Sequence, residues 1–379
     1  MSRRTSAAVS SEEGPPEPDR LEGYPHPREA VTFFGHREAE ARLADTWFSG
    51  RLHHAWLIGG PSGVGKATLA YRLTRAVLSG DAMKPQDGRL PADADSPVFR
   101  RIAARAHPSL MVLTRPWQEK TKKFATVITV DEVRRLRAFL GQTSGEGRWR
   151  CVIVDKADEL NTGAANALLK SLEEPPAFCL FLLVCDAPGR LPATIRSRCQ
   201  SLRLGPLGED DLASAVSAAI AGAGKEPPGP ERLAACMELS GGSVGRTLAL
   251  LELEGDALQR TLVELLSTAP DFDYTAVHKL VDRLTGSGAE ASYDLFFQLL
   301  SDLLSRLVSG ASRGLPARDP VEAALISRLS DRGTLAKWAE LWETVARMKA
   351  EADVLNLDRK TLILGTFFRL EETARASGP

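Results

Sequence analysis

A glycine-rich loop that ends in a lysine carries the strongest chemical signal in the sequence. It lies between an apolar run at 55–58 and a helical pattern at 67–73. Glycines let successive backbone N–H groups turn toward a phosphate, the helix N-terminus adds positive potential, and the lysine supplies charge to the terminal phosphates. The order strand, loop and helix predicts a nucleotide phosphate site with ATP as its ligand; a glycine-rich turn without a ligand is the alternative. The predicted phosphate contacts are Gly60, Gly63, Gly65 and Lys66.

The groups that would hold Mg²⁺ and activate water beside this loop are incomplete. Ala67 occupies the position where a Ser or Thr hydroxyl normally ligates Mg²⁺, and the Thr68 hydroxyl comes one residue late. A second apolar strand, 151–154, ends in Asp155, which either holds Mg²⁺ through water or caps the following turn. Lys156 stands where a general base is expected, and a charged lysine cannot accept a proton. We therefore expect phosphate binding with weak Mg²⁺ coordination and little hydrolysis.

Composition describes an ordinary globular chain. Of the 379 residues, 43% are hydrophobic and 26% are charged, with a formal net charge of −1, so any contact with nucleic acid must be local. The five cysteines form no CxxC pair and are expected to be reduced thiols, with no zinc site. Without an apolar run of membrane-spanning length or a hydrophobic signal core, the expected location is the cytoplasm, away from membranes.

The order of patterns along the chain predicts an α/β module followed by helices. Short strands are expected at 112–113 and 126–130, around a loop with Lys120, Lys122 and Lys123 that either touches DNA phosphates or is simply solvated. Helices at 132–140 and 164–172 alternate with strands at 151–154 and 179–185, which favours a parallel sheet covered on both faces. From residue 209 onward the pattern is helical, with leucine stripes at 295–307 and 362–370 that are typical of an intrachain core.

Four segments together resemble a known family. The segments are 51–56, with its paired histidines, the glycine-rich loop, 166–176, which ends Glu-Glu-Pro-Pro, and the Ser-Arg-Cys triplet at 197–199. They are similar to subunits of the bacterial sliding-clamp loader of DNA polymerase III, an AAA+ assembly, and within it to the delta-prime family. Residues 1–22 are rich in Ser, Arg, Glu and Pro and have no apolar periodicity, which predicts a disordered tail. For the rest of the chain the resemblance implies an AAA+ P-loop module at 23–205, a small helical lid at 206–255 and a C-terminal all-α collar at 256–379.

The resemblance also implies partners and a role. Gamma or tau and delta subunits would complete a ring that opens the sliding clamp, beta, and closes it around primed DNA. The Ser-Arg-Cys triplet would place Arg198 beside the γ-phosphate held by a neighbour, where a guanidinium supplied in trans accelerates phosphoryl transfer. Arg196 is the weaker candidate for that role, and solvated surface charge is the plain interpretation of both arginines.

Several positions depart from the catalytic ATPase subunits of that assembly. Their four zinc-binding cysteines are missing from 79–108, and their γ-phosphate-sensing threonine is replaced here by Cys185 or Asp186. In the lid, Gly245 takes the place of a phosphate-sensing arginine. Arg246 comes one residue late, which turns a helical side chain by about 100°.

These departures favour a subunit that binds ATP weakly or statically and supplies Arg198 in trans. The alternatives are a catalytic gamma- or tau-type ATPase, and a structural AAA+ subunit that binds no nucleotide. The chain would belong to a polymerase holoenzyme, a nucleotidyltransferase, without forming phosphodiester bonds itself, because it offers no clustered carboxylates for two-metal chemistry.

Overall fold

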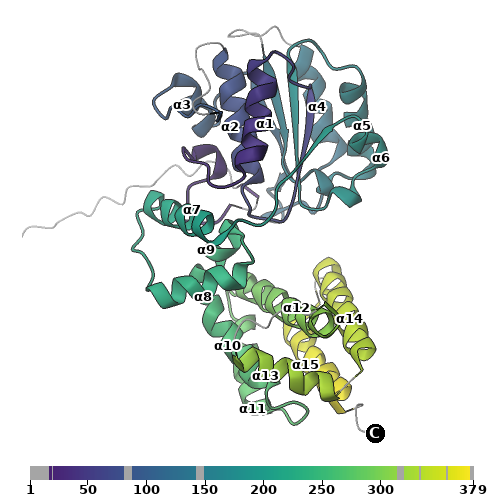
Figure 1. The fold of residues 1–379 in the computed structure, drawn as a ribbon. Helices are drawn as coiled ribbons and strands as arrows, with labels where there is room; N and C mark the ends of the chain where they lie inside the picture. The colour runs from purple at the N-terminus through teal and green to yellow at the C-terminus, as the bar shows by residue number, and fades with distance from the viewer. Residues whose placement is uncertain are drawn as a thin grey trace, which may run out of the picture. The chain divides into compact units, whose positions relative to one another are not determined.

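The structure is a computed structural model that describes residues 17–18, 20–80, 88–141, 149–313, 320–332, 334–355 and 357–375 (Figure 1). Side chains at 311–313 and 331–332 are outside this description. The chain divides into two compact units. Unit 1 comprises residues up to 227 together with Gly242–Arg246, and unit 2 comprises Pro228–Gly241 and the chain from Thr247 onward. The range expected to form a lid, 206–255, therefore contributes to both units.

Unit 1 is built on a parallel sheet with the strand order β2-β5-β6-β1-β7. Its strands are β1 (Ala55–Gly59), β2 (Leu110–Leu113), β5 (Arg150–Val154), β6 (Cys179–Cys185) and β7 (Gln200–Arg203). All four pairings are parallel, and β1 lies between β6 and β7. Every residue of β6 is buried, as expected for a central strand covered on both faces. The predicted parallel α/β module is confirmed.

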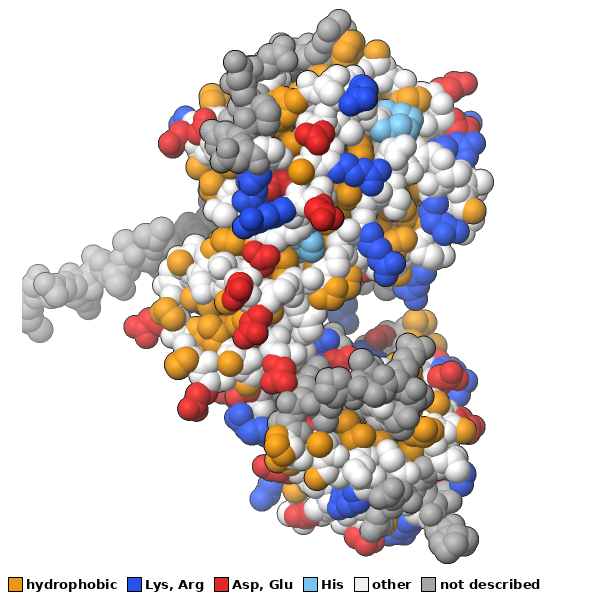
Figure 2. Space-filling view, in the orientation of Figure 1, with side chains coloured by type: hydrophobic (Ala, Val, Ile, Leu, Met, Phe, Trp, Pro, Cys, Tyr) orange, Lys and Arg blue, Asp and Glu red, His pale blue; other side chains and the backbone are white. Residues whose placement is uncertain are grey.

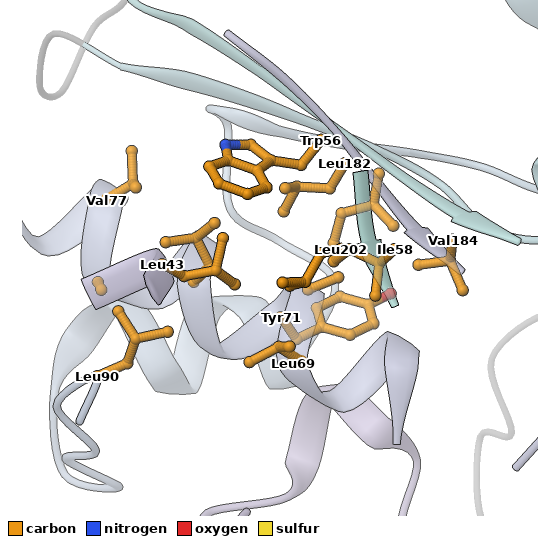
Figure 3. Packing of buried hydrophobic residues seen from close by; sticks show 14 of the residues in the cluster. Leu43, Trp56, Ile58, Leu69, Tyr71, Val77, Leu90, Leu182, Val184 and Leu202 are labelled. Atoms are coloured by element: carbon orange, nitrogen blue, oxygen red, sulfur yellow. The ribbon is translucent and has the colours of Figure 1, made fainter. Parts of the chain in front are cut away.

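Helices cover both faces of this sheet (Figure 1). The helical segments of unit 1 are η1 (Pro27–Glu29), α1 (Arg37–Phe48), α2 (Lys66–Ser79), α3 (Pro97–Ala103), α4 (Val130–Gly141), η3 (Ala157–Glu159), α5 (Thr162–Glu173), η4 (Pro188–Arg190), α6 (Ala193–Arg196) and α7 (Glu209–Gly222). Alternate residues of β1 face opposite sides, so Trp56 and Ile58 pack with α1 and α2 (Figure 3), whereas Ala55 and Leu57 belong to the core on the face of α4 and α5.

A buried ion cluster joins α1 and α2 beside the glycine-rich loop. The Glu40 side chain is fully buried and accepts hydrogen bonds from Arg72 Nε at 2.5 Å and Arg89 Nε at 2.8 Å. Arg72 also donates to the carbonyls of Val31 and Leu90. A buried carboxylate needs such partners, because losing one would leave an uncompensated charge. The cluster fixes the middle of α2 against α1 and the segment that precedes α1.

One expected strand is absent from the described structure. The pattern at 126–130 predicts a strand, but only Ile128 forms an isolated bridge, to Leu160, and α4 already begins at Val130. Neighbouring residues form a small antiparallel pair instead, β3 (Trp117–Gln118) with β4 (Lys123–Phe124). All five residues of 126–130 are β-branched, which favours a strand, but α4 begins too soon for the run to extend a ladder.

The lysine-rich loop is the turn of this small hairpin. The rings of Trp117 and Phe124 contact edge to face at a centroid distance of 5.0 Å, and exposed Lys122 pairs with Glu119 at 2.7 Å. Figure 2 shows basic and acidic side chains mixed over the displayed face, in keeping with the formal net charge of −1. Contact of Lys120, Lys122 or Lys123 with DNA stays a prediction.

Unit 2 is helical throughout its described residues. Its helices are α8 (Pro230–Ser240), α10 (Gly255–Leu266), α11 (Tyr274–Thr285), α12 (Glu290–Arg313), α13 (Pro320–Arg332), α14 (Leu335–Leu355) and α15 (Arg359–Arg375), and α9 (Val244–Glu252) continues into it from unit 1. Helix α12 packs on α14, and α14 packs on α15. Phe296 and Phe367 stack at 6.3 Å between ring centroids, so both leucine stripes contribute to the intrachain core, as predicted.

The segment before α1 is tied to α2 and α3. Residues 1–16 and 19 of the expected tail lie outside the described residues, but Glu17 accepts a hydrogen bond from Arg28 Nη2 at 2.8 Å. Arg28 Nε donates to the carbonyl of Ala103, and Arg75 Nη1 donates to the carbonyl of Arg28.

Among the described helices, none is long and apolar enough to span a lipid bilayer.

His26 makes this segment sensitive to acid. Its Nδ1 accepts from the backbone N–H of Arg28, an interaction that requires an unprotonated ring nitrogen, and burial lowers the pKa of His26 from 6.5 to about 4. The folded chain keeps this imidazole neutral while the unfolded chain protonates it, so stability present above about pH 6.5 is lost as the pH falls toward 4.

Between pH 7 and pH 5 the titration of His26 is expected to lower the free energy of unfolding by about 2 kcal/mol. Denaturant unfolding of the native chain and of His26→Asn at both pH values measures this loss. Asparagine can accept the same backbone hydrogen bond without titrating, so the variant should lose correspondingly less stability. Equal pH dependence in both proteins would contradict the assignment.

Candidate phosphate-binding site

The glycine-rich loop lies at the carboxyl edge of the sheet. Strands β1 and β6 end in register, with Gly59 opposite Cys185, and the N–H of Gly60 donates to the carbonyl of Cys185 at 3.2 Å. Parallel strands end at a common edge, which gathers the loop after β1, Asp186 after β6 and Asp155 after β5. Three separated sequence signals therefore come together in one place.

Two glycines of the loop are required by its conformation. A Cβ at Gly60 would lie 2.1 Å from the backbone oxygen of Leu204, and real side chains do not approach that closely. Gly63 has φ of +74°, in the left-handed region, and a Cβ there would lie 2.3 Å from Ser243 Oγ. The loop thus combines a tight turn with close approach to another segment.

Hydrogen bonds to three successive carbonyls orient the loop. Ser243 Oγ donates to the carbonyl of Ser62 at 2.8 Å, the N–H of Gly245 donates to that of Gly63 at 3.3 Å, and His36 Nε2 lies 3.0 Å from that of Val64. In a trans peptide the N–H points opposite to the C=O of the same unit. The N–H groups of Gly63, Val64 and Gly65 consequently point away from these three partners and are available to an anion.

His36 contributes to this orientation as a neutral donor. It has a left-handed backbone, with φ of 47°, directly before α1. Burial lowers the pKa of His36, which keeps the ring neutral, and the carbonyl of Val64 requires the proton to be on Nε2. No sequence pattern indicates this role, because the histidine lies far from the loop along the chain.

Lys66 opens α2, and its charged end lies inside the site. The side chain is 4% exposed, and its Nζ lies 2.6 Å from Asp186 Oδ1. It also donates to the carbonyl of Pro61 at 2.5 Å. Of the two residues considered for the end of the third strand, Cys185 is buried within the sheet, and Asp186 is the one that reaches the lysine.

Asp158 holds the end of β6 in place. Its carboxylate accepts hydrogen bonds from the backbone N–H groups of Asp186 at 3.1 Å and Ala187 at 3.3 Å. Sequence inspection passed over this aspartate, although it lies three residues after Asp155 in the same turn. A short acidic side chain in a turn is a common way to satisfy nearby backbone donors.

Asp155 and Thr68, the predicted Mg²⁺ contacts, also lie near the carboxyl edge of the sheet. Asp155 follows β5 and is partly exposed, and Thr68 lies in the first turn of α2. Lys156 has φ of 56° and lies 3.8 Å from Glu159, so its charge has an acidic neighbour. The described residues contain no group of three or more His, Cys, Asp or Glu side chains arranged for a metal ion.

The segment expected to sense phosphate meets the loop through its glycine. Gly245 packs on Gly63, since a Cβ at Gly245 would lie 3.3 Å from the Cα of Gly63. Ser243 directly precedes α9, and its Oγ accepts a hydrogen bond from the N–H of Arg246 in the first turn of that helix. Small residues at 243 and 245 allow this close approach, and a larger residue at either position would push the segment away from the loop.

Arg198 lies elsewhere in unit 1, directly after α6. Its side chain is 35% exposed, with Nη2 2.7 Å from Glu173 Oε1 and Nη1 donating to the carbonyl of Thr194 at 2.9 Å. Glu173 is the last residue of α5, so two segments singled out in the sequence meet in this ion pair. Arg196 is exposed at the end of α6.

Gly63→Ala is expected to destabilise unit 1 by about 1–2 kcal/mol, because alanine is strained at positive φ and its methyl group would displace Ser243. Gly189→Ala is the matched control, since a methyl group added there would meet no described atom within 4 Å and should change stability little. Denaturant unfolding measures both. Equal stability of the two variants would show that the contact between Ser243 and the loop is not made in solution.

Comparison with known proteins places this architecture among replication proteins. The family model described as DNA polymerase III, delta subunit, matches residues 35–208. The delta-prime subunit of DNA polymerase III from Escherichia coli (strain K12) is 30% identical over 332 residues, which cover 87% of this chain and 92% of that protein.

Two further relatives match over shorter stretches. The delta-prime subunit from Pseudomonas aeruginosa is 38% identical over 146 residues, or 38% of this chain and 41% of that protein. The tau subunit from Salmonella typhimurium is 28% identical over 186 residues, or 49% of this chain and 27% of that protein. Since the E. coli match extends through nearly the whole of both proteins, the chain belongs to the delta-prime family of DNA polymerase III subunits.

Proposed function

We propose that this chain is the delta-prime subunit of a bacterial clamp loader, which helps to place the sliding clamp on primed DNA during replication. Family membership along most of the chain supports the assignment. Its partners in the loader would be gamma or tau and delta subunits, and the assembly would act on the beta clamp in the cytoplasm. DNA polymerisation would be carried out by other subunits of the holoenzyme.

The trans role of Arg198 is the mechanistic centre of this proposal. The observation that supports it is the pair between Arg198 and Glu173, which holds a partly exposed guanidinium at the surface of unit 1. A guanidinium held in this way can donate to phosphate oxygens on a neighbouring subunit with little loss of side-chain entropy. It would neutralise charge that develops on the transferred phosphoryl group.

The chain's own loop would hold nucleotide without efficient turnover. The oriented N–H groups of the loop and the charge of Lys66 support phosphate binding. Lys156 occupies the general-base position and cannot activate water while charged, and Ala67 supplies no hydroxyl to Mg²⁺. ATP therefore fits the site as a weakly or statically bound ligand. Its metal would depend on Asp155, with the Thr68 hydroxyl as the remaining candidate.

Arg198→Ala in a reconstituted loader is expected to reduce clamp- and DNA-stimulated ATPase by about tenfold or more, because trans arginines contribute about 10³–10⁵ to phosphoryl transfer. Arg196→Ala is the matched control and should retain most of the activity. Size-exclusion chromatography must show intact assemblies for both variants. Unchanged turnover with Arg198→Ala would remove the trans role.

The isolated native chain is expected to show no more ATP turnover than its Lys66→Ala variant. That variant should also bind ATP about tenfold or more weakly, since a charged hydrogen bond contributes about 1.5–3 kcal/mol. Appreciable turnover by the native chain would favour the motor-type alternative. Absence of ATP binding by the native chain would favour the purely structural one.

A further inference from the structure

The ion pair between Lys66 and Asp186 affects which nucleotide the loop can bind. Lys66 is almost fully buried, and its ammonium contacts two groups of its own chain, the Asp186 carboxylate at 2.6 Å and the Pro61 carbonyl. An ammonium has three N–H donors. One donor thus remains for a phosphate oxygen, whereas a triphosphate places both its β- and γ-phosphates on this lysine.

The backbone that carries Asp186 is fixed beside the lysine. Asp186 follows the fully buried strand β6, and Asp158 fixes the backbone at both Asp186 and Ala187. Its side chain is 28% exposed, so water screens the carboxylate only in part. A phosphate bound to Lys66 would lie within about 6 Å of this carboxylate, because each anion makes a contact of about 2.8 Å with the same nitrogen.

We propose that Asp186 is the residue that determines phosphate-number selectivity at this loop, and that the native chain prefers a nucleoside diphosphate to a triphosphate. The diphosphate needs only the remaining donor of Lys66 and the loop N–H groups. The triphosphate adds the γ-phosphate charge beside Asp186 and competes with it for the ammonium. This inference rests on the proposed nucleotide binding at the same loop.

Isothermal titration of the full-length chain with ADP and with ATP, each with and without Mg²⁺, tests the proposal. The native chain should bind ADP about tenfold more tightly than ATP. Asp186→Asn keeps the size of the side chain and an oxygen that can accept from Lys66, but removes the charge. It should tighten ATP binding by about tenfold and change ADP binding by less than about threefold.

Asp131→Asn is the matched control, because it removes the same charge from an exposed carboxylate in the first turn of α4. It should leave both affinities as in the native chain. Equal ATP affinity in the native chain and Asp186→Asn would overturn the proposal, as would a native preference for ATP. Binding of neither nucleotide by the native chain would overturn both this inference and the proposed nucleotide binding, while the role of Arg198 would still be decided by the loader assay.

Discussion

The parallel pairing of β1 with β6 is the constraint on which the rest of the site depends. Because both strands run in the same direction, their carboxyl ends finish side by side, and the register sets Gly59 opposite Cys185. Lys66 and Asp186, which are 120 positions apart in the numbering, therefore form an ion pair. Buried residues on both faces of the sheet hold this register. Figure 3 shows the core on the side of α1 and α2, and a second core lies on the side of α4 and α5.

The conformation of the glycine-rich loop depends on contacts with other segments as well as on its own glycines. His36, Ser243 and Gly245 each pair with one of its carbonyls, and the N–H group of each of these peptide units points away from that partner. Under the proposed function, a phosphate would meet a loop that is already oriented, and binding would not have to order it. The same contacts make Gly63 sensitive to any added side chain.

The lysines at this edge of the sheet already have acidic neighbours. Lys66 is already engaged by Asp186, and Lys156 lies near Glu159 at the position of a general base. By contrast, Arg198 is held at the surface of unit 1 by Glu173. In this chain Lys66 is thus paired with a carboxylate, whereas Arg198 is partly exposed at the surface. Under the proposed function, this arrangement suits a subunit that assists chemistry on a neighbour.

The sequence by itself determined the architecture and the identity of the main groups. Dense apolar runs predicted β5 and β6 to within one residue, and the glycine spacing with Lys66 identified the loop, because these signals are local. Local patterns failed at 126–130, where the β-branched run forms only an isolated bridge and no strand. Only the tertiary structure decided that Asp186 rather than Cys185 meets Lys66, that Asp158 fixes the end of β6, and that His36 and Ser243 orient the loop. Those contacts join residues far apart in the chain or depend on which way a side chain leaves the end of a strand, and neither spacing nor composition encodes that direction.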